Sequence, residues 1–295
     1  MELELVWDAR AETGEGPIWW EDRLYWVDIP AGRLHAYLPK TDERLTTILA
    51  HQIGTVVPRA SGGLVLALDN GFALFDPITE KLTPLPNPPA EVLAGRFNDG
   101  KCDPRGRFWA GTMAQIDGVG RGSLKRFDTD FLCDEMQTDI RCSNGIAWSL
   151  DETRMYYIDT NKNNVMEFPY QVETGAIAGG RVLISKQLDR SEGAFDGMTM
   201  DDLGRLWIGL WQGCSVVCYD PDRDEIVDVI EVPAKNVTAC WFGGDDLQDL
   251  YITTATEDMT EEDHRTYPHA GGLFRCRPGA TGLPGVSFDS PRYAV

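Results

Sequence analysis

The feature of this sequence that most constrains its fold is a unit that recurs along almost the whole chain. Each unit contains turn residues, a short apolar run, a polar turn and a second alternating run, as in EDRLYWVDIPAGRLHAYLP and DDLGRLWIGLWQGCSVVCYDP. The first apolar runs are anchored roughly 40 to 50 positions apart, at Leu24, Leu64, Phe108, Met155, Leu206 and Leu250. A period of this length is typical of the four-stranded blades of a β-propeller.

The pattern within the units predicts strands and not helices. Alternation with a period of two residues is nearly continuous, whereas few windows show the i, i+3, i+4 spacing of a helix. Six units fill the chain, so we predict a single all-β domain, residues 1–295, folded as a six-bladed β-propeller with four-stranded blades. We expect residues 2–7 to pair with the last blade beside Leu273 and Phe274, because this closes the ring and hides two strand edges.

The charge balance excludes several classes of partner. The chain has 27 Lys and Arg against 47 Asp and Glu, so its net charge of −20 repels nucleic-acid phosphates and anionic membrane surfaces. No apolar run approaches the roughly 18 residues of a membrane-spanning helix, and the N-terminus lacks a secretory signal pattern. The seven Cys form no CxxC pair, which favours reduced thiols. We therefore expect a cytoplasmic monomer that acts on a small molecule, with no nucleic-acid or membrane partner.

Each blade needs an innermost strand just before its anchor, and the candidates are GPIWW, GTVVPRA, NDGKCDP, NGIAWSL, DGMTMDD and NVTACWF. The polar residues at or just before these starts include Glu15, Arg96, Asn98, Asn144, Asp196 and Asn236. Since innermost strands line the channel of a propeller, we expect these groups to converge at one mouth of it. Turn formation explains any one of them. Four blades with a carboxylate or carboxamide in the same phase indicate an oxygen-donor site for one divalent ion: Ca²⁺, Mg²⁺, Mn²⁺, Fe²⁺ or Zn²⁺.

Five segments occur in an order that points to a known family: TGEGPIWWEDRLYWVDI, RFNDGKCDPRGRFWAGTM, SNGIAWSLDETRMYYIDT, DGMTMDDLGRLWIGLWQG and NVTACWFGGDDLQDLYITTA. Together they resemble the regucalcin (senescence marker protein) and gluconolactonase family, over nearly the whole chain. The resemblance implies a six-bladed propeller that hydrolyses sugar lactones with a divalent metal. It also implies metal binding by Glu15, Asn144 and Asp196, and substrate binding by Arg96 and Asn98.

Two departures from the family pattern concern the site. Phe195 stands directly before Asp196, where the family often has Pro, so its ring is a candidate to line the pocket. After AGTM the chain reads Gln115, Ile116, Asp117, where some family members carry an acidic residue that reaches the sugar. Whether Asp117 or the loop 114–122 contacts substrate stays open.

A lactone is an internal ester, and a divalent ion at its carbonyl would act as a Lewis acid. Asp196 is the candidate catalytic general base for the attacking water, although metal binding is its stronger expected role. We therefore predict an enzyme, a metal-dependent sugar (aldono) lactonase that forms the sugar acid. A non-catalytic calcium-binding or regulatory protein and a phosphotriesterase-like propeller hydrolase stay open as alternatives. The sequence does not specify the sugar, the ring size or the native metal.

Overall fold

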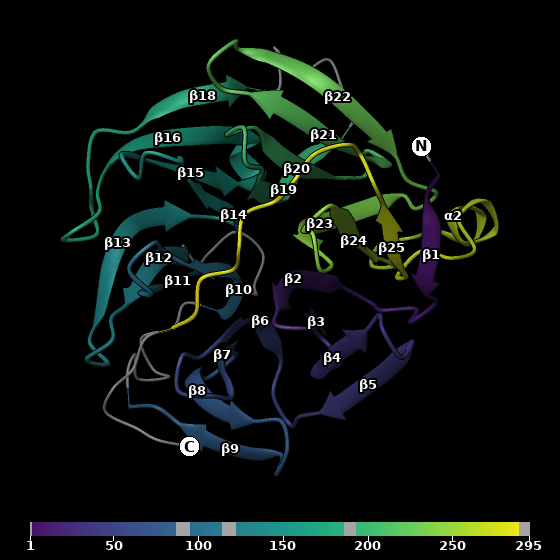
Figure 1. Cartoon of the computed structure of the whole chain (residues 1–295), viewed down its shortest axis with the longest axis horizontal. Helices are drawn as coiled ribbons and strands as arrows, with labels where there is room; N and C mark the ends of the chain where they lie inside the picture. Colours follow the sequence, from purple (N-terminus) through teal and green to yellow (C-terminus); the bar gives the residue numbers. More distant parts are fainter. Residues whose placement is uncertain (1, 87–94, 114–121, 186–192, 289–295) are drawn as a thin grey trace.

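The chain folds into a ring of six antiparallel sheets, which Figure 1 shows down the shortest axis of the molecule. The structure is a computed structural model and describes residues 2–86, 95–113, 122–185 and 193–288. In five sheets the strands follow one another outward in chain order, and the sixth combines the two ends of the described chain. The predicted six-bladed β-propeller is confirmed.

The first three blades each contain four strands in chain order. Their strands are β2 (Gly14–Trp20), β3 (Arg23–Asp28), β4 (Arg33–Leu38) and β5 (Glu43–Ile48), then β6 (Ile53–Pro58), β7 (Leu64–Leu68), β8 (Gly71–Asp76) and β9 (Lys81–Pro84), and then β10 (Arg96–Cys102), β11 (Phe108–Met113), β12 (Gly122–Phe127) and β13 (Cys133–Ile140).

The fourth blade differs from the prediction because its sheet has five strands. Its strand β16 pairs with β18 along the first half of its length and with the two-residue strand β17 at its end. The strands of this blade are β14 (Ser143–Trp148), β15 (Arg154–Asp159), β16 (Asn164–Gln171), β17 (Ala176–Ile177) and β18 (Arg181–Ser185). The extra strand forms because β16 extends past the blade and turns back on itself before β18 begins.

The fifth and sixth blades complete the ring. The fifth contains β19 (Ala194–Met200), β20 (Leu206–Trp211), β21 (Ser215–Asp220) and β22 (Glu225–Glu231), and the sixth contains β23 (Asn236–Gly243), β24 (Asp249–Ala255), β25 (Leu273–Cys276) and β1 (Glu4–Trp7). The short helices are η2 (Thr160–Lys162) and α2 (Glu261–Thr266). No helix in the described ranges is long and apolar enough to cross a membrane.

Strand β1 closes the ring as predicted. It pairs antiparallel with β25, with Leu5 opposite Phe274 and Trp7 opposite Leu273. Figure 1 shows this strand lying along the outer side of the last blade. The indole of Trp7 also packs edge-on against Trp26 in β3, with ring centroids 5.5 Å apart. The closing strand therefore joins the last blade to the first blade, as well as covering the edge of β25.

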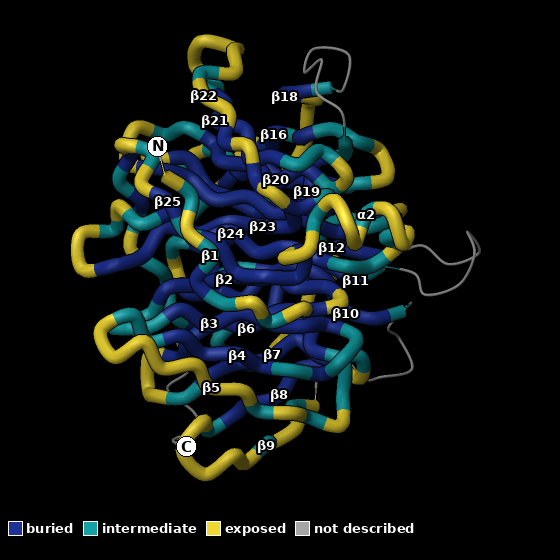
Figure 2. Tube along the Cα trace, turned by 90° about the vertical axis from the view of Figure 1, so that its right-hand side faces the viewer, coloured by how far each residue is buried: buried dark blue, intermediate teal, exposed yellow. Residues whose placement is uncertain are grey.

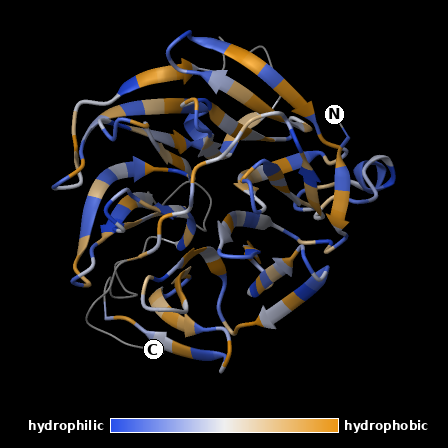
Figure 3. Cartoon of the chain, in the orientation of Figure 1, coloured by the Kyte–Doolittle hydropathy of each residue, from blue (hydrophilic) through white to orange (hydrophobic). Residues whose placement is uncertain are grey.

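Apolar side chains fill the spaces between neighbouring blades. Inner and middle strands such as β6 and β7 are buried along their whole length, whereas the outermost strands such as β5 are mostly exposed. Figure 2 shows this gradient of burial, and Figure 3 shows that hydrophobic residues concentrate in the strands. Burial of both faces explains why the inner strands read as nearly continuous apolar runs.

The segment that follows β25 crosses one face of the ring, as Figure 1 shows. It bridges to the fifth blade between Gly282 and Asp201, and to the second blade between Phe288 and Arg59. The ring of Phe288 is fully buried and stacks on Phe127, with centroids 5.6 Å apart. We call residues 277–288 the C-terminal strap.

Candidate functional site

The predicted site residues lie on four innermost strands and are buried around the axis of the ring. Glu15 belongs to β2, Asn98 to β10, Asn144 to β14 and Asp196 to β19, and each is at most 4% exposed. Arg96, at the start of β10, is 9% exposed. All five residues lie within the first three positions of their strands, so the predicted convergence at one mouth of the channel is found.

A β-bulge interrupts the pairing of each of these four strands beside its site residue. A bulge bends the strand and redirects its side chains, which helps to bring these groups toward the axis. Close packing explains the glycines that directly follow Asn144 and Asp196. A Cβ at Gly145 would lie 2.8 Å from the carbonyl oxygen of Asp196, and a Cβ at Gly197 would lie 2.4 Å from the Cβ of Ala239. The NG and DG pairs are therefore strand residues at sites of close approach, and not turns.

Three buried carboxylates dominate the electrostatics of the site. Burial, followed by the charge of Asp99, raises the pKa of Glu15 to about 8, although a hydrogen bond from the Gly16 amide opposes the shift. Burial also raises the pKa of Asp196 well above its usual range, and the charges of Glu15 and Asp99 add to the effect. The Glu15 and Asp196 carboxyl groups also act directly on each other. Their carboxyl groups are thus adjacent, and both cannot carry a charge without a compensating proton or cation.

A chain of amide hydrogen bonds joins the remaining site residues. Arg96 Nη1 donates to Asn98 Oδ1 at 2.7 Å, and Asn98 Nδ2 donates to Asn144 Oδ1 at 3.2 Å and to the carbonyl oxygen of Ser143 at 2.7 Å. Asn144 Nδ2 donates to Thr160 Oγ1 at 2.8 Å. This network orients the oxygen of Asn144 and holds the guanidinium of Arg96 beside the carboxylates.

The donor set fits a hard divalent cation. Asp196 Oδ1 is buried and accepts no hydrogen bond within the described part of the chain. A buried carboxylate oxygen without a partner is costly, and a cation would remove that cost. In the described ranges no three His, Cys, Asp or Glu side chains form a metal-binding group. The candidate set differs from such a group because it combines two carboxylates, Glu15 and Asp196, with the carboxamide of Asn144.

The structure adds two acidic residues to the predicted set of site residues. Asp99 follows Asn98 in the RFNDG motif and is 8% exposed, and its charge acts on both Glu15 and Asp196. Glu257 also acts on Asp196, and it accepts a hydrogen bond of 2.6 Å from Thr13 Oγ1. The RFNDG motif marks Asp99, because it places this carboxylate directly after Asn98. No motif marked Glu257, which follows the end of β24.

Phe195 and Asp117 bear on the two departures from the family pattern. The ring of Phe195 is 1% exposed and packs in the apolar cluster of the fourth and fifth blades with Ile184 and Leu210. Because neighbouring strand residues point to opposite faces, Phe195 faces that cluster while Asp196 faces the site. The structure therefore places this candidate ring in the apolar cluster between the blades. Asp117 and residues 114–121 of the predicted loop lie outside the described residues.

Comparison with known proteins agrees with this geometry. The family model described as "SMP-30/Gluconolactonase/LRE-like region" matches residues 13–256. The chain is 37% identical over 98% of its length to "Putative sugar lactone lactonase YvrE" of Bacillus subtilis, covering 99% of that protein. It is 36% identical over 98% of its length to "Pentonolactonase XacC" of Haloferax volcanii, covering 99% of it.

A solved structure described as a calcium-binding protein, regucalcin, from Agrobacterium tumefaciens superimposes with a TM-score of 0.89. The two sequences are 26% identical, and the match covers 96% of each chain. The repeat, the ring of blades and the converging polar residues thus agree with the matches of sequence and of structure. The chain belongs to the SMP-30/gluconolactonase/LRE-like family.

Proposed function

We propose that this protein is a sugar lactonase that hydrolyses an aldono lactone to the sugar acid with the help of one divalent metal ion. The observation that carries the proposal is the pair of adjacent buried carboxylates, Glu15 and Asp196, beside the Arg96–Asn98 pair at one mouth of the channel. The names of two relatives, a sugar lactone lactonase and a pentonolactonase, support the same reaction class.

Glu15, Asn144 and Asp196 would hold the metal ion, which is Ca²⁺, Zn²⁺, Mn²⁺, Mg²⁺ or Fe²⁺. The unpartnered Oδ1 of Asp196 and the raised pKa of both carboxyl groups support this assignment, because a cation would offset the burial of their charges. When bound, such an ion supplies Lewis-acid polarisation of a carbonyl and lowers the pKa of a coordinated water.

The residues of the chain would carry the proton and orient the substrate. Asp196 accepts a proton as water adds to the lactone carbonyl carbon, and the tetrahedral intermediate then collapses with cleavage of the bond to the ring oxygen. The proton passes to that oxygen, which leaves as a hydroxyl group of the open-chain acid. Arg96 and Asn98 hold hydroxyl groups or the ester by hydrogen bonds, of which those from the guanidinium are the stronger.

A panel of aldono-1,4- and 1,5-lactones tests the proposal. Initial rates are measured on chelated protein and after re-addition of single metals, and the spontaneous hydrolysis of each lactone is subtracted. We expect turnover of at least one sugar lactone, its loss on chelation and its recovery with one or more of the five metals. Turnover that persists at the same rate after complete chelation would contradict the metal role, and no turnover with any metal would contradict the reaction.

A second candidate function is non-catalytic calcium binding. The name of the Agrobacterium tumefaciens structure favours it, and the same donor set would serve. The two functions separate in the panel, because a calcium-binding protein of this kind would bind Ca²⁺ without turning over any lactone. In either case we propose a monomer with no nucleic-acid or membrane partner, which the net charge of −20 supports.

A further inference from the structure

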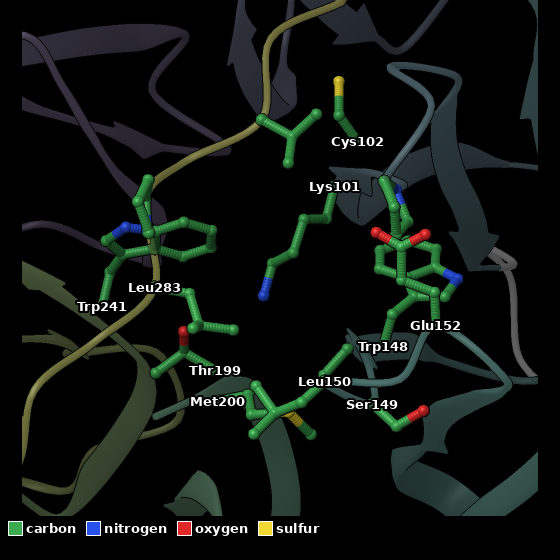
Figure 4. Close-up of a pocket in the computed structure, with 14 residues that line it drawn as sticks. Lys101, Cys102, Trp148, Ser149, Leu150, Glu152, Thr199, Met200, Trp241 and Leu283 are labelled. Carbon is green, nitrogen blue, oxygen red and sulfur yellow. The ribbon is translucent and has the colours of Figure 1, made fainter. Parts of the chain in front are cut away.

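The opposite mouth of the channel contains a second pocket, which Figure 4 shows. Its volume is about 280 Å³, and the far ends of the innermost strands form its walls. Lys101 lies three positions after Asn98, next to the end of β10, and Trp148 ends β14, four positions after Asn144. The lining residues that matter below are Lys101, Trp148, Met200, Trp241 and Leu283. The C-terminal strap supplies Leu283 and closes one side.

The pocket is separate from the candidate active site. Between them the channel narrows to a space of about 10 Å³ that is lined by Asp99, Lys101 and Met198, among others. A cavity of this size holds about one water molecule. This narrow space separates a ligand in the second pocket from Glu15 and Asp196 along the axis.

Lys101 places a positive charge in an otherwise mostly apolar pocket. Figure 4 shows its side chain extending between Trp241 and Trp148, with Nζ near the middle of the pocket. Nζ donates to the carbonyl oxygen of Met198 at 2.7 Å and lies 4.4 Å from the centre of the Trp241 ring. An ammonium group has three N–H donors, and these two contacts leave one for a ligand.

The other charged group in the lining does not neutralise Lys101. Glu152 lies at the rim with a side chain that is 39% exposed, and it pairs with Arg105 at 3.8 Å. Burial lowers the pKa of Lys101 to about 8, and the charge of Asp99 offsets this only in part. A ligand carboxylate would supply the compensation that the protein lacks here, since an opposite charge at short range favours the charged ammonium.

We propose that this pocket binds a small monocarboxylate with an apolar body, its carboxylate on Lys101 and its body among Trp148, Met200, Trp241 and Leu283. The walls favour an apolar body, because few polar groups line them. The ligand carries a single negative charge, because the net charge of −20 repels polyanions and Lys101 is the cation that the pocket offers. The proposal is independent of lactone hydrolysis.

Calorimetric titration of the whole protein with 3-phenylpropionate, hexanoate and benzoate tests the site, with 3-phenylpropan-1-ol as the uncharged partner of the first. We expect saturable binding of at least one acid. Lys101→Met keeps the apolar stem and removes the charge, so it should weaken that acid at least about tenfold and the alcohol less than about threefold. Leu283→Glu should abolish binding of the acid, because it adds a negative charge to the half-buried wall of the pocket.

Lys40→Met serves as the matched control, because Lys40 is an exposed lysine that pairs with Asp245 at the surface, and it should bind the acid like the parent protein. Circular dichroism is used to check that each variant is folded. If Lys101→Met does not fold, Leu283→Glu still tests the pocket. The proposal is overturned if none of the three acids binds saturably. It is also overturned if both pocket variants bind the acid as the parent does, or if gluconate competes for the site as well as the apolar acids do.

Discussion

Replacing Glu15 by Gln should make the metal-free protein more stable at neutral and mildly alkaline pH. The side chain is buried, and its pKa rises from the ordinary value of 4.5 to about 8. The folded state therefore holds its proton more tightly than the unfolded state does. The contribution of Glu15 to the stability of the metal-free parent is fully present below about pH 4.5 and is lost as the pH rises toward 8.

The size of the effect follows from the shift. One pKa unit corresponds to about 1.4 kcal/mol, so a rise from 4.5 to about 8 lowers the free energy of unfolding by about 3 kcal/mol at pH 7, by about 4 kcal/mol at pH 8 and by at most about 5 kcal/mol above it. Gln cannot ionise, and its amide oxygen can still accept the hydrogen bond of 2.8 Å from the Gly16 amide. The variant should therefore lose this part of the pH dependence.

Chemical denaturation of chelated parent and Glu15→Gln between pH 5 and 8 measures the difference. The two proteins should converge near pH 5 and separate progressively above it, with the variant more stable. A metal ion at a hundred times its dissociation constant should then stabilise the parent by about 2.7 kcal/mol and the variant by less. Parallel pH profiles for the two chelated proteins would refute the reasoning, because they would show that Glu15 does not bind a proton more tightly on folding.

Three further predictions follow from the site and the ring. Asp196→Asn should retain some metal affinity through its amide oxygen but lose lactone turnover by at least about 10², as initial rates would show; near-normal turnover would assign proton transfer to another group such as Asp99. Arg96→Ala and Asn98→Ala should raise KM and leave metal affinity, measured by calorimetry, nearly unchanged; a parallel loss of metal affinity would contradict a substrate role. Deletion of residues 2–7 should lower Tm severely because it uncovers the edge of β25, and unchanged melting would contradict closure by β1.

The sequence was sufficient for the architecture because its signals are local and repeated. Alternating runs and turn residues specify strands and hairpins within each unit, and six units of similar length specify the number of blades. The same phase places Glu15, Asn144 and Asp196 at equivalent starts of innermost strands, so their convergence could be predicted before any distance was known. The short extra strand β17 could not, since it depends on how far β16 extends past its blade.

Only the tertiary structure decided which further groups meet at the two mouths of the channel. Glu257 approaches the site from the end of β24 and bonds to Thr13, which is 244 positions away in the chain, so no local pattern could mark it. Phe195 faces the apolar cluster because the bulge in β19 and the packing of the blades set the direction of each side chain. The pocket around Lys101 exists because the C-terminal strap crosses the ring. Local periodicity determines strands and their order, whereas contacts between distant segments depend on how the closed ring positions them.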